Sequence, residues 1–370
     1  MKLRTLVIAV GLLAVLAAVA FLGNRPAPAP VADPRVGTPL LAPDTAQKAA
    51  GLSVSDQGKR VDLARDAKGT WIVKDYYGLP ADFDKIARLV QDLNEAKVER
   101  FVTESPERLA HLDFKDSAIS LEDAAGKAIW SLTLGKSSDN GNGKFIRFGT
   151  EKKAFFSTLH VWLDTDPKAW ADTRLVTVQA DDVASVRIPF DGGAAVVLTR
   201  AKKGAPWTAT GGPEGQRLSE AKVSPVLAAL TGLRFSETTE PESPAAAEAA
   251  RHARTLTLTT FAGKTLSIAI GRKPEEKRLK APSVDAKAAV AALAKPVDGK
   301  PADAKPSDVK AVLPEFETIP AGPVFVSVTS SDPADPVNAS MKARAFQVEE
   351  FSVSSVPQKA ADLFEPAPAK

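Results

Sequence analysis

A stretch of about eighty residues occurs twice in this chain. Trp71 recurs as Trp207 and Gly135 recurs as Gly271, both at a separation of 136 residues. Other pairs match at nearly the same separation: Leu63 and Leu198, Arg65 and Arg200, Gly69 and Gly204, Ile86 and Val223, Leu89 and Val226, Leu93 and Leu230, Glu104-Ser105-Pro106 and Glu242-Ser243-Pro244, and Ala125-Gly126-Lys127 and Ala262-Gly263-Lys264. Such a repeat predicts the tandem duplication of one folding unit.

Each copy is predicted to be an α+β unit with a mainly antiparallel sheet. Leu52 and Val54 alternate with polar neighbours before a turn at residues 56–58, a pattern that predicts a meander of short strands. One helix should pack on this sheet and further hairpins should complete it. We expect the first repeat to span residues 51–174 and the second to span residues 175–357.

Helix signals follow the meander in both copies. Asp82 is a predicted N-cap of a helix with one apolar stripe. The stripe consists of Phe83, Ile86, Leu89, Val90 and Leu93. In the second copy Ser219 is a plausible cap, although Pro225 would then lie inside the helix; a helix that starts at Ser224, with Pro225 in its first turn, is the alternative.

The terminal hairpins of the two copies are also predicted. Residues 145–148 should pair with residues 154–156 in the first copy. Residues 324–328 should pair with residues 345–348 in the second.

The N-terminus carries a membrane signal. Lys2 and Arg4 precede an uncharged apolar run at residues 5–23, and a helix of this length reaches about 28 Å, close to the thickness of the hydrocarbon core. We expect residues 1–23 to form a cytoplasmic N-terminus and one transmembrane anchor, with the bulk of the chain exported across the membrane. A cleaved secretory signal, with Ala18-Val19-Ala20 as its small-residue site, is the alternative.

Three segments are predicted to lack a fixed fold. Residues 24–50 are rich in Pro and Ala and should form a semi-stiff linker. Residues 272–318, within the second copy, are rich in Lys, Ala and Pro and should form a mobile insertion. This insertion is either a solvated loop or a contact to anionic lipid or wall polymer. Residues 358–370 should form a flexible tail.

Charge and cysteine content exclude several classes of function. The net charge is only +3 and both signs are interspersed, which disfavours nucleic-acid binding. The chain has no cysteine, so disulfides, thiolate catalysis, cysteine-ligated metals and an acylated cysteine anchor are excluded.

Local catalytic motifs are missing as well. His111, His160 and His252 are too few and too far apart for a sequence-local metal site. His111 and His252 each follow the repeated Glu-Ser-Pro, so the surface or the end of a helix is the expected place for them, and a shared site is the alternative. Gly263-Lys264-Thr265 lacks the first glycine of a phosphate-binding loop and is predicted to be a hairpin turn. Residues 139–143 lack the ligand pattern of a calcium loop and are also predicted to be a turn. We therefore assign no catalytic, cofactor or metal residue, while paired carboxylates assembled from distant positions stay open.

The repeated tryptophans have two interpretations. Trp71 and Trp207 follow a glycine-containing turn and have apolar neighbours, which favours a place in the core of each sheet. An exposed pair that stacks on a sugar is the alternative.

The order of these features resembles that of the uncharacterised bacterial family named domain of unknown function 4340. The resemblance rests on Gly69-Thr70-Trp71, Phe101-Val102, Leu132-Thr133-Leu134-Gly135 and residues 170–175, and it covers residues 52–356. His111-Leu112-Asp113 departs from the family, standing where a Tyr-Gly-Leu-like element is expected. The resemblance implies an envelope protein that faces the periplasm, often encoded beside exporter components similar to auxiliary subunits of gliding-motility-type transporters. It supplies no catalytic residues.

Two functional hypotheses follow. The first is a non-enzymatic, membrane-anchored periplasmic protein that acts as an accessory or scaffold component of an envelope or ABC-type transport assembly. Its partners would be the inner membrane, through residues 5–23, and an envelope or transporter protein. The second is a periplasmic hydrolase or glycan-binding protein that acts on envelope polymer in a groove between the repeats.

Overall fold

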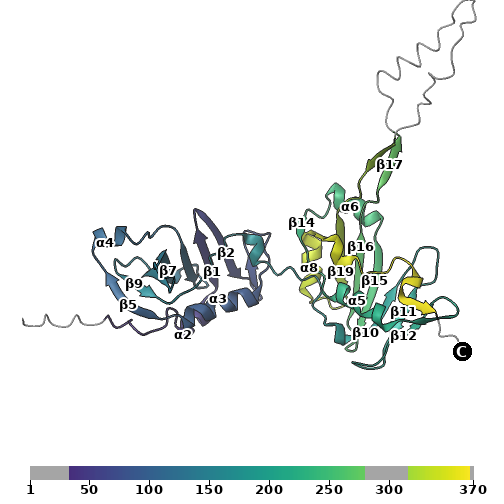
Figure 1. Cartoon of the computed structure of the whole chain (residues 1–370), viewed down its shortest axis with the longest axis horizontal. Coiled ribbons are helices and arrows are strands. Elements are labelled where there is room, and N and C mark those ends of the chain that lie inside the picture. Colours follow the sequence, from purple (N-terminus) through teal and green to yellow (C-terminus); the bar gives the residue numbers. More distant parts are fainter. Residues whose placement is uncertain (1–32, 280–315, 367–370) are drawn as a thin grey trace, which may run out of the picture. The chain divides into compact units, whose positions relative to one another are not determined.

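A computed structural model describes residues 33–279 and 316–366 of the chain. The chain divides between Asp172 and Thr173 into two compact units, the first and the second unit. Both are α+β, because each has one large antiparallel sheet and a few helices (Figure 1). Among the described residues, no helix is long and apolar enough to cross a membrane. The predicted span at residues 5–23 lies outside these residues.

The first unit is built on a nine-stranded sheet whose neighbouring strands are all antiparallel. In spatial order the strands are β4 (Leu79–Pro80), β3 (Trp71–Val73), β2 (Lys59–Arg65), β1 (Gly51–Asp56), β6 (Ala118–Glu122), β7 (Ala128–Ser137), β8 (Lys144–Phe148), β9 (Ala154–Ser157) and β5 (Val98–Thr103). Val54 of β1 pairs with Val61 on one side and Ile119 on the other, and all three are buried. The predicted meander and the hairpin of β8 and β9 are confirmed.

Helix α3 (Phe83–Glu95) supplies the apolar partner of this sheet. The Asp82 carboxylate accepts hydrogen bonds from the backbone nitrogens of Asp84 and Lys85 at 3.0 and 3.2 Å, so the predicted cap is confirmed. The buried side chains of the helix are Ile86, Leu89 and Leu93. Phe83, predicted to lie in the same stripe, is instead 59% exposed, because it is the first helical residue and no preceding turn covers it.

The second unit is built on an eight-stranded antiparallel sheet. In spatial order the strands are β12 (Thr208–Thr210), β11 (Val196–Thr199), β10 (Val183–Ile188), β15 (Arg254–Thr260), β16 (Thr265–Gly271), β19 (Val324–Ser330), β20 (Ala345–Val348) and β14 (Glu237–Thr239). The predicted pairing of β19 with β20 is confirmed, since Val326 pairs with Phe346. A helix, α8 (Pro336–Ala343), lies between these two strands in the chain.

Helix α5 (Glu220–Thr231) of the second unit contains Pro225 in its interior. Ser219 is its N-cap residue, although its side chain makes no capping hydrogen bond. The alternative start at Ser224 is therefore wrong. The helix continues through the proline because Val223 is buried in one stripe with Val226, Leu227 and Leu230, and this burial outweighs the missing backbone donor.

Short elements complete the two units. Those of the first unit are α2 (Pro43–Lys48), α4 (Pro106–Ala110) and η1 (Pro167–Trp170). Those of the second unit are η2 (Ala180–Asp182), α6 (Pro244–Arg251), α9 (Glu350–Val353), η3 (Ala360–Leu363) and the two-stranded pairs of β13 (Gln216–Leu218) with β21 (Phe364–Pro366) and of β17 (Glu276–Leu279) with β18 (Phe316–Ile319).

The predicted linker at residues 24–50 is wrong for its described part, residues 33–50. Leu40 and Leu41 are buried in the first unit, and the backbone nitrogen of Leu40 donates to the Ala96 carbonyl at 3.0 Å. Arg35 forms two hydrogen bonds with the Glu151 carboxylate, at 2.6 and 2.8 Å. The segment packs because it contains two adjacent leucines, which the overall Pro/Ala composition concealed.

The other two segments predicted to lack a fold also need correction. The ends of the insertion at residues 272–318 form the β17–β18 ladder, which projects from the rest of the second unit (Figure 1). Residues 280–315 lie outside the described part. In the predicted tail at residues 358–370, Leu363 and Phe364 are buried and β21 pairs with β13, because these two apolar side chains favour packing over solvent.

Candidate functional site

Trp162 of the first unit is 88% exposed, more than any other large apolar side chain of the described residues. It lies between β9 and η1, in a segment without helix or strand. Tryptophan seldom stands so far out of a folded unit, because its ring has a large apolar area to bury. The ring therefore marks a candidate interaction site.

The segment around Trp162 is held on both sides. Leu159, before it, is buried, and its backbone nitrogen donates to Ser157 Oγ at 3.2 Å. After it, Asp164 forms an ion pair of 2.7 Å with Lys85 of α3, and the Asp164 carbonyl accepts from Trp170 Nε1 at 2.8 Å. Trp162 is thus an exposed ring on a fixed support rather than part of a free loop.

Asp164 is the electrostatic centre of this support. Burial acts to raise the pKa of its carboxyl, but the ammonium of Lys85 and the backbone N–H of Asp166 outweigh that effect and hold the pKa below its usual range. Lys85 Nζ also lies 4.5 Å from the centre of the Trp170 ring and donates to the Ala169 carbonyl at 2.9 Å. The carboxylate therefore stays ionised at neutral pH and keeps the segment in place.

Two hollows border Trp162, and their charges differ. The hollow of about 230 Å³ towards α3 carries Lys85, Arg88 and His160 against one acid, Asp92. The hollow of about 550 Å³ towards the β1–β2 turn carries the acids Asp56, Asp164 and Asp166 against one base, Lys59. We call Trp162 together with these two hollows the Trp162 surface. A complementary ligand would meet an apolar ridge between a mainly basic and a mainly acidic side.

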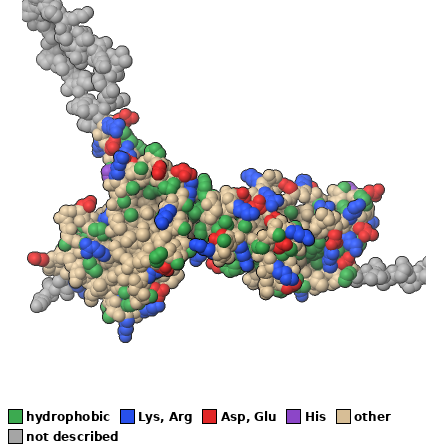
Figure 2. Space-filling model, turned by 180° about the vertical axis from the view of Figure 1, so that it is seen from behind, with side chains coloured by type: hydrophobic (Ala, Val, Ile, Leu, Met, Phe, Trp, Pro, Cys, Tyr) green, Lys and Arg blue, Asp and Glu red, His purple; other side chains and the backbone are tan. Residues whose placement is uncertain are grey.

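The charge pattern elsewhere is mixed. Figure 2 shows basic and acidic side chains interspersed over the face of each unit that it draws. Such interspersion gives no extended field of one sign on that face. The contrast between the two hollows beside Trp162 is therefore a local feature.

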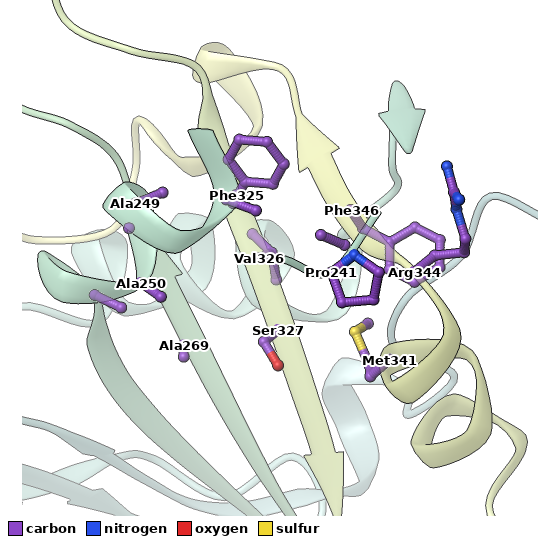
Figure 3. Close-up of a pocket in the computed structure, with 14 residues that line it drawn as sticks. Pro241, Ala249, Ala250, Ala269, Phe325, Val326, Ser327, Met341, Arg344 and Phe346 are labelled. Carbon is purple, nitrogen blue, oxygen red and sulfur yellow. The ribbon is translucent and has the colours of Figure 1, made fainter. Parts of the chain in front are cut away.

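The second unit contains an apolar cavity of about 180 Å³, which we call the α6 pocket. Figure 3 shows β19 running between α6, which carries Ala249 and Ala250, and α8, which carries Met341. The residues that define it are Ala246, Ala250, Ala269, Phe325, Met341 and Arg344. The space arises because alanines, rather than larger apolar residues, line the side of α6 that faces the strands.

A glycine sets how close α6 lies to the sheet. A Cβ atom at Gly271 of β16 would lie 2.2 Å from the Ala249 carbonyl oxygen. Only glycine permits this approach, and it brings the alanine face of α6 over β16 and β19. The repeated glycine of the sequence therefore has a packing role beside the pocket.

Arg344 borders the pocket at the end of α8 (Figure 3). Its side chain is only 8% exposed and forms an ion pair with the carboxylate of Glu240, whose side chain is 74% exposed. Arg344 Nε also lies 3.3 Å from Thr238 Oγ1 of β14. These contacts join the end of α8 to β14 and to the segment that follows it.

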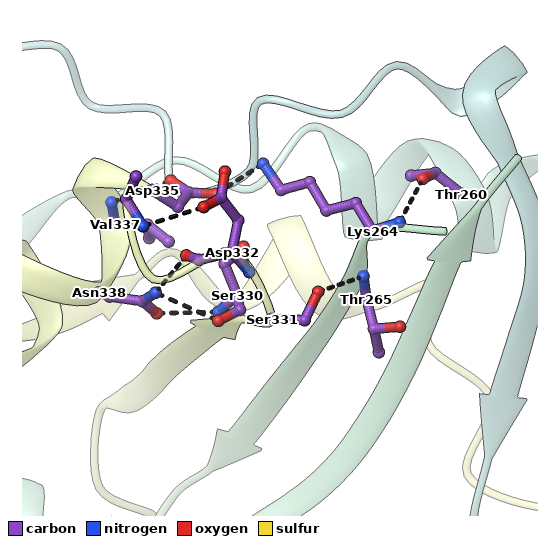
Figure 4. Close-up of polar contacts among 10 residues, drawn as sticks. Thr260, Lys264, Thr265, Ser330, Ser331, Asp332, Asp335, Val337 and Asn338 are labelled. Atoms are coloured by element: carbon purple, nitrogen blue, oxygen red, sulfur yellow. Dashed lines mark hydrogen bonds and ion pairs between the residues drawn. The ribbon is translucent and has the colours of Figure 1, made fainter. Parts of the chain in front are cut away.

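The position of α8, one wall of the pocket, is fixed at its N-terminus (Figure 4). Asp335 caps the helix by accepting from the Val337 backbone nitrogen at 3.1 Å and pairs with Lys264 Nζ at 2.6 Å. Asn338 bonds the backbone of Ser330 at the end of β19 through both its nitrogen and its oxygen. These bonds join α8 to β19 and to the β15–β16 turn.

The three histidines lie at the surface. His111 and His252 are the C-cap residues of α4 and α6 and are exposed, and His160 is exposed beside Trp162. The expectation of surface or helix-end positions is confirmed for His111 and His252. Among residues 33–279 and 316–366, no set of three or more metal-binding side chains is found. A site shared by His111 and His252, which belong to different units, stays a prediction.

The two turn predictions are confirmed. Gly263 has φ +80° in the turn between β15 and β16. Residues 139–143 lie in the connection between β7 and β8, where a Cβ at Gly143 would meet the Ser157 carbonyl oxygen at 2.0 Å.

The repeated tryptophans differ in burial. Trp71 is buried in β3, as expected for the core, whereas Trp207 is half-buried just before β12, so the core prediction is wrong for Trp207. An arginine guanidinium lies over each ring. Arg65 Cζ lies 5.2 Å from the centre of the Trp71 ring, and Arg200 Cζ lies 4.6 Å from the centre of the Trp207 ring. Arg200 also bonds the carbonyls of residues 180 and 183, and this holds Trp207 at the edge of the core.

The fold defines an α+β protein made of two units, each with a mainly antiparallel sheet. The model of the family described as "Domain of unknown function (DUF4340)" matches residues 71–253, and this match confirms the resemblance of the chain to that family. No curated protein and no solved structure matches the chain.

Sequence reasoning missed Trp162, the α6 pocket and Arg344. A usable signal existed for the helices of the pocket, because Ser243-Pro244 and Asp335-Pro336 each place a capping residue before a proline at the first helical position. The proposed groove between the repeats depends on how the units are placed and stays a prediction.

Proposed function

We propose that this chain is a non-enzymatic, membrane-tethered periplasmic protein that serves as an accessory component of an envelope or ABC-type transport assembly. The observation that carries the proposal is the exposure of Trp162 on a support fixed by Lys85 and Trp170. The proposed partner is a protein of that assembly, and the Trp162 surface is where it docks.

The physical argument is that a pre-positioned tryptophan binds at low entropic cost. Tryptophan is enriched among the residues that dominate binding energy at protein interfaces, and a fixed support reduces the ordering cost of association. The basic and acidic hollows on either side would favour a partner that presents an acidic group towards Arg88 and a basic group towards Asp56. This arrangement would fix the orientation of the partner.

A structural role for the perturbed carboxylates supports a non-enzymatic function. The pKa values of Asp33, Asp164 and Asp335 are all lowered, and each carboxylate pairs with a lysine and accepts a backbone N–H bond. These bonds hold a chain segment or a helix end in each case. A general acid would need the opposite shift.

We also propose that the two units arose by tandem duplication. The strand order β3-β2-β1-β6-β7-β8-β9-β5 of the first sheet has its counterpart in the order β12-β11-β10-β15-β16-β19-β20-β14 of the second. The Arg65–Trp71 and Arg200–Trp207 contacts occupy matching positions in the sequence. Superposition of the two units, strand by strand in this order, is the direct test.

Crosslinking tests the docking proposal. A photo-reactive phenylalanine derivative replaces Trp162 in one variant and Phe83 in the control, because Phe83 is also exposed in the first unit but lines neither hollow. We expect position 162, and not position 83, to crosslink to an inner-membrane transport component in living cells. Equal crosslinking at both positions, or none at 162, would contradict the docking site, and degradation of wall polymer by the purified chain would overturn the non-enzymatic role.

A topology experiment tests the location. Alkaline phosphatase, which is active only after export, is fused after residue 32, with a fusion to a chain that lacks residues 5–23 as control. We expect activity and membrane retention from the first fusion and neither from the second. Release of the first fusion into the soluble periplasmic fraction would favour a cleaved signal over the proposed anchor.

A further inference from the structure

Two arginines of the first unit have no anionic partner. Among the residues that the structure describes, no carboxylate pairs with Arg100 of β5 or Arg147 of β8, and neither side chain donates a hydrogen bond. Arg147 is half-buried, and its Nε atom is buried without an acceptor. A guanidinium that has lost water without gaining a counter-charge is costly for the folded state. Its two terminal nitrogens also lack an acceptor but are not buried, so an anion from outside the chain can reach them.

Phenyl rings connect the two arginines. Arg100 Cζ lies 5.2 Å from the centre of the Phe156 ring, and Arg147 Cζ lies 5.2 Å from the centre of the Phe114 ring. The Phe156 ring lies 5.6 Å, centre to centre, from the ring of Phe145, which stands two positions before Arg147 in β8. All three rings are half-buried. We call these five residues the Phe145 strip, an apolar surface with one cation beside Phe156 and one beside Phe114.

The strip lies on one face of the nine-stranded sheet. Ile146, between Phe145 and Arg147 in β8, is fully buried, so its two neighbours point to the opposite face. Phe145 pairs with Phe156 of β9, and Phe156 pairs with Arg100 of β5, so Arg100 lies two strands away from β8. With a strand spacing of about 4.8 Å and a rise of about 3.4 Å per residue, the Cα atoms of Arg100 and Arg147 are about 12 Å apart. This distance sets the spacing of the anions that a ligand must present.

An extended peptide has the required spacing. Its residues rise about 3.3 Å each and alternate between two sides, so the first, third and fifth residues share one side and the first and fifth are about 13 Å apart. Acidic residues at the first and fifth positions would meet the two guanidinium groups, with which carboxylates form paired hydrogen bonds. An apolar residue at the third position would lie on the phenyl rings. The strip therefore fits an acidic segment with one apolar side chain midway.

The chemistry of the rings favours a protein segment over a sugar. Phenylalanine has no polar atom, whereas a sugar that loses water needs hydrogen-bond partners for its hydroxyl groups. The strip offers only its two guanidinium groups for that purpose. Aromatic residues and arginine are the residues enriched at protein–protein interfaces.

We propose that the Phe145 strip binds an extended acidic segment of a partner protein, with two acidic residues four positions apart and an apolar residue midway between them. The carboxylates pair with Arg100 and Arg147, and the apolar side chain covers the phenyl rings. The strip shares no residue with the Trp162 surface, so the two proposals stand or fall separately.

A peptide series tests the chemistry without altering the protein. The peptide Glu-Thr-Leu-Thr-Glu, labelled with a neutral dye, is titrated with the full chain, and binding is followed by fluorescence anisotropy. Replacement of both glutamates by glutamine should weaken binding at least about tenfold, because two charge-assisted hydrogen-bonded pairs are lost. The rearranged peptide Glu-Thr-Leu-Glu-Thr, of equal charge, should bind several-fold more weakly, because its acids point to opposite sides. Equal affinity for the original and the rearranged peptide, no binding of either, or tighter binding of tetragalacturonate, an anionic sugar chain, would overturn the proposal.

Variants test the two arginines. Arg100→Gln and Arg147→Gln should each weaken binding of Glu-Thr-Leu-Thr-Glu at least about fivefold. Each variant should also become insensitive to glutamine at one end of the peptide, and the two variants at opposite ends, a pattern that a general loss of folding would not produce. The matched control is Arg187→Gln, at an exposed strand position of the second unit, which should leave the affinity within about twofold. Unchanged affinity in Arg100→Gln and Arg147→Gln, or an equal loss in Arg187→Gln, would refute the site.

Discussion

Lys264 Nζ lies 2.6 Å from Asp335 Oδ2 and joins the β15–β16 turn to the N-terminus of α8. Lys264 stands in one of the two Ala-Gly-Lys elements of the sequence, and the sequence allowed us to assign it only to a turn. In the structure this lysine also fixes the helix that forms one wall of the α6 pocket. A local turn residue therefore has a long-range role.

The first prediction concerns acid stability. Burial acts to raise the pKa of Asp335, but Lys264 and the Val337 N–H outweigh it, so the folded pKa lies below the unfolded value near 3.8. The stabilisation is therefore fully present above that value and is lost as the pH falls through the folded pKa. Asp335→Asn should lower the free energy of unfolding by about 1–2 kcal/mol at pH 7, and the difference from wild type should shrink below about pH 4.

Urea unfolding of the full chain between pH 3 and pH 7 measures this effect. Asp332→Asn is the control, because Asp332 is exposed and close in sequence. A difference between Asp335→Asn and wild type that stays constant over this range would show that the charge of Asp335 is not the cause.

The second prediction concerns the contact of α6 with the sheet. In Gly271→Ala the new Cβ would lie 2.2 Å from a backbone oxygen, so strand and helix must move apart, and we expect a loss of about 1–3 kcal/mol in the unfolding of the second unit. Gly193→Ala is the control, because its new Cβ would meet no atom within 4 Å and its φ is not positive. Thermal denaturation should separate the two variants, and equal stability would mean that the close approach is unimportant.

The third prediction concerns the segment that composition alone assigned to a linker. Leu41 is fully buried, so Leu41→Ala should destabilise the first unit by about 2–5 kcal/mol. Lys48→Ala, at a well-exposed position of α2, should change stability by no more than about 0.5 kcal/mol. Limited proteolysis and denaturant unfolding provide the measurement; a tolerant Leu41→Ala would restore the linker interpretation.

The fourth prediction concerns the C-terminal strand. Leu363 and Phe364 are buried, and the Phe364 ring lies against Gly212. The double variant Leu363→Ala/Phe364→Ala should cost about 3–6 kcal/mol, because two large apolar side chains lose their burial. Glu365→Ala removes only an exposed ion pair with Arg217 and should cost less than about 1 kcal/mol. Hydrogen exchange of the β13 amides would follow the loss of pairing, and protection equal to wild type in the double variant would contradict it.

Much of the fold could be predicted because its signals are local. Alternation of apolar residues located β1, β2 and β3, and a capping aspartate located the start of α3. Helices α6 and α8 were not predicted, because their alanines, serines and asparagine do not form an apolar stripe. Trp207 was predicted to lie in the core but is half-buried, because its burial depends on residues far along the chain. Composition gave the wrong prediction for residues 33–50 and for the C-terminal segment. A few buried side chains there, such as Leu41 and Phe364, fold segments whose average composition is polar or rich in proline.

The sequence by itself determined the α+β class, the main strands and the turns, because alternation, capping and glycine conformation act between neighbouring residues. Only the tertiary structure decided the candidate sites. Arg344 meets Glu240 across 104 residues and Lys85 meets Asp164 across 79, and such pairs form only when distant strands and helices are brought together by packing. Exposure is decided in the same way, since nothing next to Trp162 in the chain indicates that the folded unit leaves its ring in water.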